Sequence, residues 1–351
     1  MTSYWVDRLF EQGRLPKEGY RYLLECDLSQ TQNYLQMKAQ EMAERHFSRS
    51  IYLRGLIEVS NFCRNDCHYC GIRCSNGEVE RYRLSEQTIL ECCQRGYDLG
   101  LRTFVLQGGE DVALTDTKVE QIIASIHAQF PQCAITLSLG ERKREAYERF
   151  YAAGASRYLL RHETFNAEHY AQLHPERMSH ANRMECLHSL KEISFQVGSG
   201  IMVGSPHQSI DHIVEDILFI ERFQPHMIGI GPFIAHHQTP FAAHPNGDVS
   251  LTLRLLSIFR LVVPRALIPS TTALASLDDR GHQKGILAGA NVVMPNLSPA
   301  AERSKYAIYD NKAAFGSEAA EGIAMLRKKF DEIGYSISFE RGDSPMIGDK
   351  K

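Results

Sequence analysis

Apolar residues along this chain fall into short runs, which alternate with stretches where they recur every three or four positions. The short runs end in Gly, Ser, Thr or Pro, which is typical of buried strands followed by turns. They lie at residues 51–59, 103–107, 134–139, 157–163, 195–203, 226–234, 267–272 and 291–295. We expect each of these runs to form one strand of a parallel sheet.

Helical patterns fill the intervals between the runs. The clearest covers residues 209–223 and repeats apolar positions with a period of 3.6 residues. Its polar positions are expected to face away from the core: Asp211, His212, Glu215 and Asp216. Ser85 and Ser250 should each begin a further helix, and residues 2–47 should form helices before the first strand, one of them opened by Pro16.

Strand and helix units of this number, spread over about 245 residues, match the usual size of a closed (β/α)8 barrel of the TIM type. An open, doubly wound sheet is the alternative, although that fold more often has fewer units and a Gly-x-Gly-x-x-Gly first turn. We therefore predict an α/β fold in three parts. These are an N-terminal helical extension (residues 1–47), the barrel (48–310), and a C-terminal helix and tail (311–351) whose last dozen residues are solvated.

A group of cysteines directly follows the first apolar run. Cys63, Cys67 and Cys70 form the pattern Cys-x3-Cys-x2-Cys. Three thiolates can hold a 4Fe-4S cluster while leaving its fourth iron open, whereas a cluster used only for electron transfer is ligated by four. A small molecule can chelate the open iron and be reduced there. The spacing therefore indicates a catalytic cluster.

Cys74 extends the pattern and leaves other interpretations open. A ferredoxin loop would begin Cys-x2-Cys and carry a proline after its fourth cysteine, where Ser75 stands here. A structural zinc site would usually show a second pair of Cys or His ligands, which is not found. We expect Cys74 to be a bystander thiol. An electron carrier that uses all four cysteines remains the alternative of another class.

Composition limits the remaining possibilities. The chain has 39 basic and 42 acidic residues, and its net charge of −3 gives no indication of nucleic-acid binding. No apolar run reaches the roughly 18 residues that a membrane-spanning helix requires. An odd number of cysteines and the lack of an apolar, cleavable leader argue against disulfides. We therefore expect a cytoplasmic enzyme that binds neither nucleic acid nor membrane.

Polar residues gather where the expected strands end, which is where TIM-type barrels carry their chemistry. The second strand ends in Gln-Gly-Gly-Glu (107–110), and paired glycines let a ligand approach the backbone closely. In the fourth strand, alternation places Arg157, Arg161 and Glu163 on one face. Charges inside a barrel need partners or ligands. These residues should therefore bind a ligand or form a structural Arg–Glu network.

Hydroxyl groups and histidines follow the later strands. Four hydroxyl side chains are expected at the barrel mouth: Thr271, Thr272, Tyr306 and Tyr309. They are candidates for substrate contacts, although threonines at strand ends often only cap helices. A divalent ion at His236, His237 and His244 is the alternative to a polar loop, but adjacent histidines are expected to point in different directions and to chelate poorly. His162 should face outward from the fourth strand and has no expected role.

The cysteine pattern, with Tyr69 before the last cysteine, resembles the signature of the radical S-adenosylmethionine (SAM) enzymes. In that superfamily the open iron binds the amino and carboxylate groups of SAM. Residues 54–61, 137–141, 159–164 and 229–234 further resemble the HydE family of FeFe-hydrogenase maturases, and the likeness spans roughly residues 45–310. Biotin synthase and methylornithine synthase share the barrel and the cysteine loop. A radical SAM enzyme acting on an organic substrate is therefore the main alternative.

The resemblance implies a role for each candidate residue. Cys63, Cys67 and Cys70 would hold the cluster. The residues that would bind SAM are Tyr69, Gly108, Gly109, Glu110, Ser138, Glu163 and Arg183. Among these, Glu163 would accept hydrogen bonds from the ribose hydroxyls and Arg183 would meet the SAM carboxylate. The residues that would contact the substrate are Arg161, Thr271, Thr272, Tyr306 and Tyr309.

The resemblance also implies cofactors and partners. One 4Fe-4S cluster is expected, because no cysteine follows Cys186 to hold the accessory cluster of some family members. A ferredoxin or flavodoxin would supply the electron that cleaves SAM. The substrate would be a small iron complex bearing cysteine, carbon monoxide and cyanide, supplied by the tyrosine-cleaving maturase. The product would reach the hydrogenase through the GTPase scaffold maturase. This substrate rests on the resemblance alone.

Overall fold

Six of the apolar runs form a continuous parallel sheet in the computed structural model, which describes residues 3–312 and 319–349. In spatial order its strands are β2 (Gly55–Ser60), β3 (Thr103–Gly108), β4 (Ala134–Ser138), β5 (Ala155–Leu159), β6 (Gln196–Ser199) and β8 (Met227–Ile228). Every residue of β2 is buried, as expected for a parallel strand that is covered on both faces.

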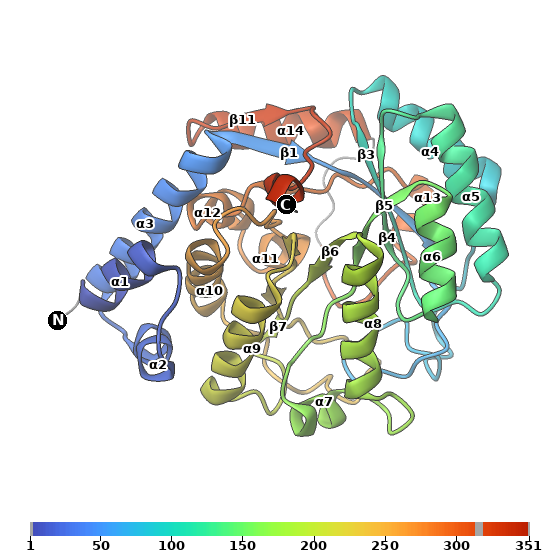
Figure 1. Ribbon diagram of the computed structural model, residues 1–351. Coiled ribbons are helices and arrows are strands. Elements are labelled where there is room, and N and C mark those ends of the chain that lie inside the picture. The colour runs from blue at the N-terminus through green and yellow to red at the C-terminus, as the bar shows by residue number, and fades with distance from the viewer. Residues whose placement is uncertain (1–2, 313–318, 350–351) are drawn as a thin grey trace.

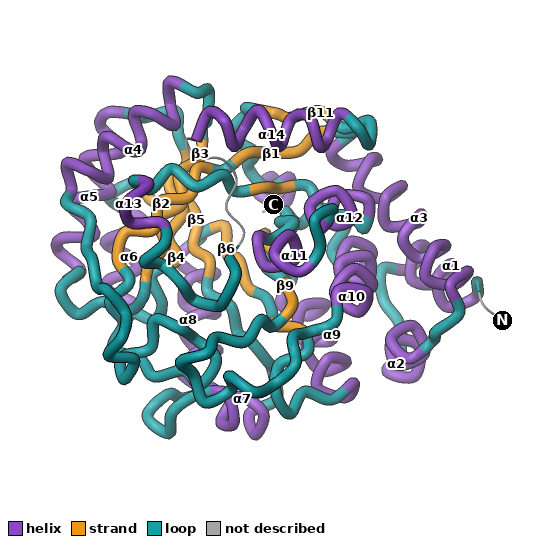
Figure 2. The backbone as a smooth tube through the Cα atoms, turned by 180° about the vertical axis from the view of Figure 1, so that it is seen from behind, coloured by secondary structure: helices purple, strands orange, loops and turns teal. Residues whose placement is uncertain are grey.

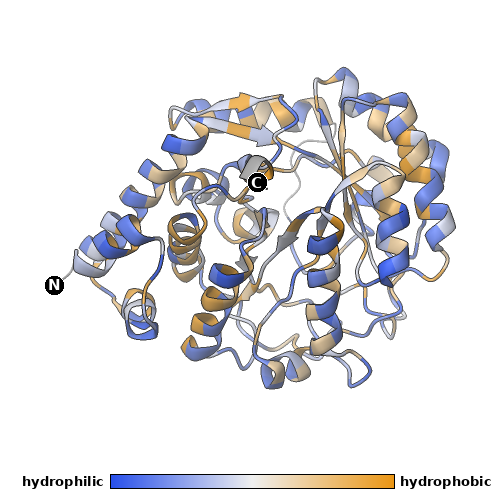
Figure 3. Ribbon diagram, viewed as in Figure 1, coloured by the Kyte–Doolittle hydropathy of each residue, from blue (hydrophilic) through white to orange (hydrophobic). Residues whose placement is uncertain are grey.

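Helices cover the outside of this sheet and bury their apolar faces against it (Figures 1 and 3). They are α4 (Glu86–Asp98), α5 (Asp116–Gln129), α6 (Arg144–Ala152), α8 (His180–Ile193), α9 (Ile210–Phe223) and α10 (Val249–Val262). The side chain of Ser85 caps α4 by accepting a hydrogen bond from the backbone of Thr88, so the predicted start of this helix is confirmed.

The remainder of the barrel is irregular. Strands β7 (Met202–Val203), β9 (Gly231–Pro232) and β10 (Val292–Val293) have two residues each. Single bridges join Met227 to Leu267, Pro269 to Val292 and Leu56 to Asn296, and they close the ring. The predicted α/β barrel is confirmed, but the strand predicted over residues 267–272 is wrong. Pro269 has no N–H to donate to a ladder, and Thr271 already caps the helix α11 (Thr272–Leu277).

The N-terminal residues form the predicted helical extension. Its helices are α1 (Tyr4–Gln12), α2 (Lys17–Glu25) and α3 (Ser29–Phe47). Pro16 immediately precedes α2, where its fixed φ is compatible with a helix start. Helix α3 packs along α10 on one side of the barrel (Figure 1).

The C-terminal residues close one end of the barrel. Helix α14 (Ala319–Asp331) was predicted, and β11 (Ser336–Ser338) then pairs in parallel with β1 (Ser50–Leu53). The buried guanidinium of Arg157 donates to Oδ1 of Asp343 at 2.7 Å and to the carbonyl of Arg341 at 2.9 Å. The prediction of a solvated tail holds only in part: Gly342 and Ser344 are buried and Asp343 pairs with the buried cation on β5, whereas Pro345 and Ile347 are exposed. Residues 350–351 lie outside the described part.

The opposite end of the barrel carries the long loops, which gather in the view of Figure 2. No helix in the described part of the chain has both the length and the apolar character needed to cross a membrane.

Candidate functional site

The loop between β2 and α4 (residues 61–85, here called the cysteine loop) consists of turns and irregular backbone, apart from one isolated bridge. Its shape depends on side chains that bind its backbone. Arg81 donates to the carbonyls of Asn61 at 2.6 Å and Ile72 at 2.8 Å, and Arg73 pairs with Asp66 at 2.6 Å. The loop is thus held in one conformation without a ladder of backbone hydrogen bonds.

The three predicted ligands, Cys63, Cys67 and Cys70, are partly buried free thiols within this loop. Burial and the neighbouring thiols raise the pKa of Cys70 to about 12 and raise the pKa of Cys67 well above its usual range. Three close thiols that are disfavoured as free thiolates fit a metal centre, because bound iron would supply the positive charge that stabilises them. The donor set therefore suits an iron-sulfur cluster.

Cys74 occupies a different environment. It is exposed, and its Sγ lies 3.6 Å from a guanidinium nitrogen of Arg177. Its backbone N–H donates to the carbonyl of Asn65 at 2.9 Å. That Cys74 is a bystander stays a prediction.

The end of β3 packs directly on the cysteine loop. A Cβ atom at Gly109 would lie 2.3 Å from the carbonyl oxygen of Phe62 and 2.7 Å from Cβ of Cys63. Only glycine fits this position, which explains the second glycine of the Gln-Gly-Gly-Glu segment. The backbone of Gly108 and Gly109 is therefore the part of β3 nearest the predicted cluster.

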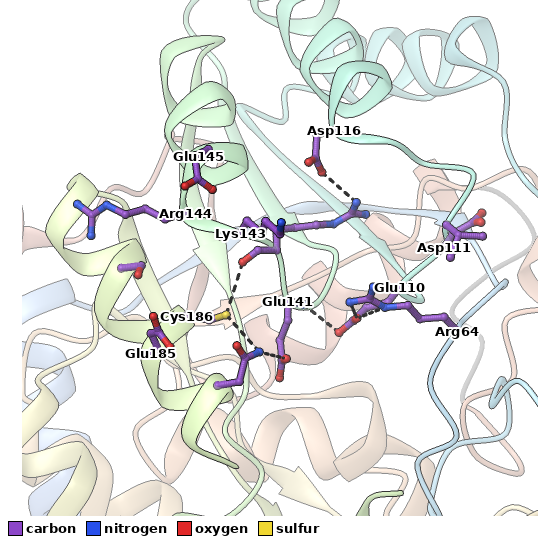
Figure 4. A pocket seen from close by; sticks show the side chains of 14 residues that line it. Arg64, Glu110, Asp111, Asp116, Glu141, Lys143, Arg144, Glu145, Glu185 and Cys186 are labelled. Atoms are coloured by element: carbon purple, nitrogen blue, oxygen red, sulfur yellow. Dashed lines mark hydrogen bonds and ion pairs between the residues drawn. The ribbon is translucent and has the colours of Figure 1, made fainter. Parts of the chain in front are cut away.

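The carboxylate of Glu110 points away from this contact, into a cavity of about 560 Å³ on the outside of the loop (Figure 4). It accepts a hydrogen bond from the backbone of Glu141 at 2.9 Å and pairs with Arg64 at 2.9 Å. Of the residues predicted to bind SAM, only Glu110 lines the cavity. This cavity therefore does not bring together the residues predicted to bind SAM.

Arg161 and Glu163 lie beyond the end of β5, which stops at Leu159, so the strand predicted through residue 163 is wrong in its last residues. Glu163 has a φ of 64°, in the left-handed region that non-glycine residues seldom adopt. Its N–H donates to the carbonyl of Gly200 at 3.0 Å, which holds this conformation. Arg157, predicted on the same face, lies at the closed end of the barrel and is structural.

The side chains of Arg161 and Glu163 have hydrogen-bonding capacity to spare. A guanidinium nitrogen of Arg161 lies 2.8 Å from Oε2 of Glu163, yet the angle between them does not make a hydrogen bond. Among the described residues, Nε and NH2 of Arg161 and Oε2 of Glu163 are buried without a hydrogen-bond partner. Buried polar atoms of this kind are normally satisfied, so the pair fits a ligand that is rich in polar groups.

Arg183, in the first turn of α8, brings a second cation to the site. Its Nε donates to the carboxylate of Glu141 at 2.6 Å, and NH1 donates to the carbonyl of Arg161. Its positive charge is close enough to lower the pKa of both Cys67 and Tyr69, against the larger effect of burial. An anionic group beside the cluster would be stabilised here.

His162 lies on the outer face of the strand end, as predicted, but it is fully buried against α9. Its Nδ1 is 2.8 Å from Oγ of Ser199, and its Nε2 is 3.3 Å from Oδ1 of Asp216. Asp216 also accepts a hydrogen bond from the backbone of Phe165 at 2.6 Å. The prediction that Asp216 faces solvent is therefore wrong, because it anchors the turn that carries Glu163.

Three of the predicted substrate residues can be placed by their contacts. Thr271 caps α11 through a hydrogen bond from the backbone of Leu274 at 3.4 Å, so the capping alternative applies to it. Tyr306 is buried, and its hydroxyl lies 3.5 Å from the amide nitrogen of Gln107, which pairs in register with Ser138. Burial raises the pKa of Tyr309 to about 12, and Arg161 is close enough to oppose this shift.

Glu58 is a buried residue of this site that sequence reasoning missed. Its carboxylate accepts a hydrogen bond from the amide of Asn296 at 2.9 Å and pairs with Lys312. Lys312 also donates to the carbonyl of Tyr306 at 3.2 Å. The sequence feature that could have indicated Glu58 is its position as an acidic residue inside the first apolar run. Lys312, 254 positions away, could not have been found by pattern.

Of the three histidines after β9, two lie beside a carboxylate. Asp310 is next to His236 and His237, whereas His244 packs against a phenylalanine. The rings of His236 and His237 are stacked, so the expectation that they point in different directions is wrong. The backbone of Gln238 donates to Nδ1 of His236 at 3.1 Å, so its ring proton is on Nε2, which faces Asp310. Asp310 also accepts a hydrogen bond from the backbone of His237 at 2.9 Å, so its carboxylate has a partner within the chain.

Comparison with known proteins gives four results. The family model of the radical SAM superfamily matches residues 57–220. The FeFe-hydrogenase maturase subunit HydE of Thermotoga maritima is 39% identical over 296 residues, which cover 84% of each chain. The crystal structure of methylornithine synthase (PylB) superposes with a TM-score of 0.85 at 22% identity and covers 95% of this chain and 97% of that chain. The structure of the maturase HydG of Carboxydothermus hydrogenoformans superposes with a TM-score of 0.78 at 18% identity, and the match covers 96% of this chain and 79% of that chain.

Proposed function

The chain belongs to the HydE family of radical SAM enzymes, and from this premise we propose that it processes a small iron complex bearing cysteine, carbon monoxide and cyanide during assembly of the FeFe-hydrogenase active site. The observation that carries the proposal is the pair of unsatisfied side chains, Arg161 and Glu163, beside the three-cysteine loop. When bound, a 4Fe-4S cluster with an open iron supplies the electron that cleaves SAM into methionine and a 5'-deoxyadenosyl radical.

The chain's own residues would hold SAM from three directions. Glu163 would accept hydrogen bonds from the ribose hydroxyls with Oε2, which has no hydrogen-bond partner among the described residues and forms an ion pair with Arg161. Arg183 would face the carboxylate of SAM, since its charge already lies near Cys67. The remaining residues proposed to line the SAM site are Tyr69, Gly108, Gly109, Glu110 and Ser138. For Glu110 the contribution would come from its backbone, because its carboxylate is engaged with Arg64.

The substrate would lie farther into the barrel. Nε of Arg161 is buried without a hydrogen-bond partner among the described residues, and NH2 has only its ion pair with Glu163, so the guanidinium could donate to the carboxylate of a cysteine ligand. Thr271, Thr272, Tyr306 and Tyr309 would supply hydroxyl groups around it. The closed end of the barrel, sealed by Arg157 and Asp343, would keep water and stray hydrogen donors from the reacting groups.

We further propose one cluster per chain, a ferredoxin or flavodoxin as electron donor, and exchange with the tyrosine-cleaving maturase and the GTPase scaffold maturase. The absence of any cysteine after Cys186 supports the single cluster. The relationship to a hydrogenase maturase supports the partners and a place in the cytoplasm beside them.

The test combines the reconstituted protein with dithionite, SAM and the synthetic iron complex. We expect 5'-deoxyadenosine to form, and the treated complex to activate apo-hydrogenase when the other maturases are present. The same assay without this protein is the control. No 5'-deoxyadenosine would indicate an electron carrier. Turnover of an organic substrate with no need for the iron complex would overturn the maturase assignment and leave the radical SAM class intact.

A further inference from the structure

The last residues of helix α7 (Ala167–Leu173) and the residues that follow them contact the cysteine loop from the outside. We call residues 172–178 the bracket. Its contacts with the loop are His68 N to Leu173 O at 3.0 Å, His68 Nδ1 to Gln172 O at 3.0 Å, Arg177 to the carbonyl of Arg64, and Cys67 Sγ to Met178 Sδ at 3.7 Å. The bracket therefore touches the loop on both sides of its central cysteine.

His174 adds a contact whose direction can be derived. Its Nδ1 lies 2.9 Å from the carbonyl oxygen of Tyr170, which can only accept, so Nδ1 carries the ring proton. Burial lowers the pKa of His174 to about 3, so the ring is neutral and Nε2 has a lone pair. The hydroxyl of Tyr69, 3.2 Å away, must therefore donate to Nε2.

Tyr69 stands between two of the predicted cluster ligands, Cys67 and Cys70. Its ring packs in an apolar cluster with Leu173 and Phe233. A hydroxyl in such surroundings is destabilising unless it finds a partner. Nε2 of His174 is such a partner at 3.2 Å, and the Tyr69 side chain also lies close enough to Cys67 to lower the pKa of that thiol against the larger effect of burial. The position of the ring, and of the peptide units on either side of it, is thus coupled to His174.

We propose that His174 is a positioning residue for the cysteine loop: by accepting the hydrogen bond of Tyr69 it holds Cys67 and Cys70 in the arrangement that receives the cluster. The loop has no ladder of backbone hydrogen bonds, so ordering it costs conformational entropy that such contacts offset. The inference rests on the radical SAM function proposed above, since it concerns the loop that would bind the cluster.

The test measures how fast an iron chelator removes the cluster from reconstituted protein, with SAM affinity as a second readout. His174→Phe removes the acceptor nitrogen, Nε2, and keeps an aromatic ring at this position. Tyr69→Phe removes only the hydroxyl group. Each should release iron about 3- to 10-fold faster, the range expected for one lost hydrogen bond. The double variant should match the single variants, because both changes remove the same bond. His174→Gln places an amide oxygen near the position that Nε2 occupies in the wild type, where it can accept the hydrogen bond. Iron release from this variant should therefore be slower than from His174→Phe.

Tyr170→Phe is the matched control. Its ring stacks on His174 at 3.9 Å, but among the described residues its buried hydroxyl has no partner, so iron release should stay at the wild-type rate. Wild-type rates in both single variants, additive effects in the double variant, or an equal effect of Tyr170→Phe would each overturn the inference. Tyr69→Phe keeps the test decisive if His174→Phe does not fold. A wild-type protein that binds no cluster would instead refute the proposed function.

Discussion

The two halves of the barrel are built differently. In the first half, β2 and β3 have six residues each, and the strands from β2 to β6 pair side by side in parallel, with register shifts only between β2 and β3 and between β4 and β5. In the second half, β7, β8, β9 and β10 have two residues each, and single bridges complete the ring. The residues proposed to bind the cofactors come mainly from loops of the first half, whereas Thr271, Thr272, Tyr306 and Tyr309 come from the second.

Close backbone contacts replace long ladders in the second half. A Cβ atom at Gly200 would lie only 1.8 Å from the carbonyl oxygen of Gly229, so two chain segments cross there with no room for a side chain. The regular half therefore positions its strand ends through a hydrogen-bonded ladder, whereas the irregular half depends on close contacts between loops. Changes in the first half should therefore affect cofactor binding, and changes in the second half should affect the substrate alone.

The largest effect should come from the cysteine loop. Replacing Cys63, Cys67 or Cys70 with Ala should abolish both cluster binding and SAM cleavage, because two thiolates cannot hold the cluster. Cys74→Ala is the matched control and should keep wild-type iron content and activity. Iron analysis measures cluster binding, and the yield of 5'-deoxyadenosine measures SAM cleavage. Loss of the cluster in the Cys74 variant would mean that four cysteines bind it.

A smaller effect is expected from Glu163→Gln, which keeps the shape of the side chain and removes its charge. Charge-assisted hydrogen bonds contribute about 1.5 to 3 kcal/mol, so SAM affinity should fall roughly 10- to 100-fold while the cluster is retained. Equilibrium titration with SAM measures the dissociation constant. An unchanged value would make Glu163 a structural partner of Arg161 and nothing more.

The smallest effect should come from the second half. A Thr271→Val, Thr272→Val double variant should bind cluster and SAM normally and lower hydrogenase maturation by about 3- to 10-fold, as expected for lost neutral hydrogen bonds. Since Thr271 also caps α11, its valine variant loses about 1 kcal/mol of helix stability. The double variant with Ser at both positions keeps the cap and the hydroxyls and should mature hydrogenase normally. Weaker SAM binding in the valine variant would contradict the division between the halves.

Local features of the chain were readable from the sequence. The cysteine spacing, the glycine pair after β3 and the order of strands and helices each depend on residues that are neighbours in the chain, so periodicity and spacing reveal them. The N-terminal helices and the barrel class followed from the same patterns. The predicted strand ends were less accurate, because prolines and the Thr271 cap interrupt the later strands.

The contacts that complete the site were decided by tertiary structure. Arg157 and Asp343 are 186 positions apart in sequence, and His174 is 105 positions from Tyr69. Closure of the barrel brings such pairs together, and no local pattern encodes which distant side chain will satisfy a buried charge or hydroxyl. The sequence by itself thus determined the chemistry of the cysteine loop and the class of fold. The tertiary structure alone determined how that loop is held, because its shape depends on side chains from distant parts of the chain.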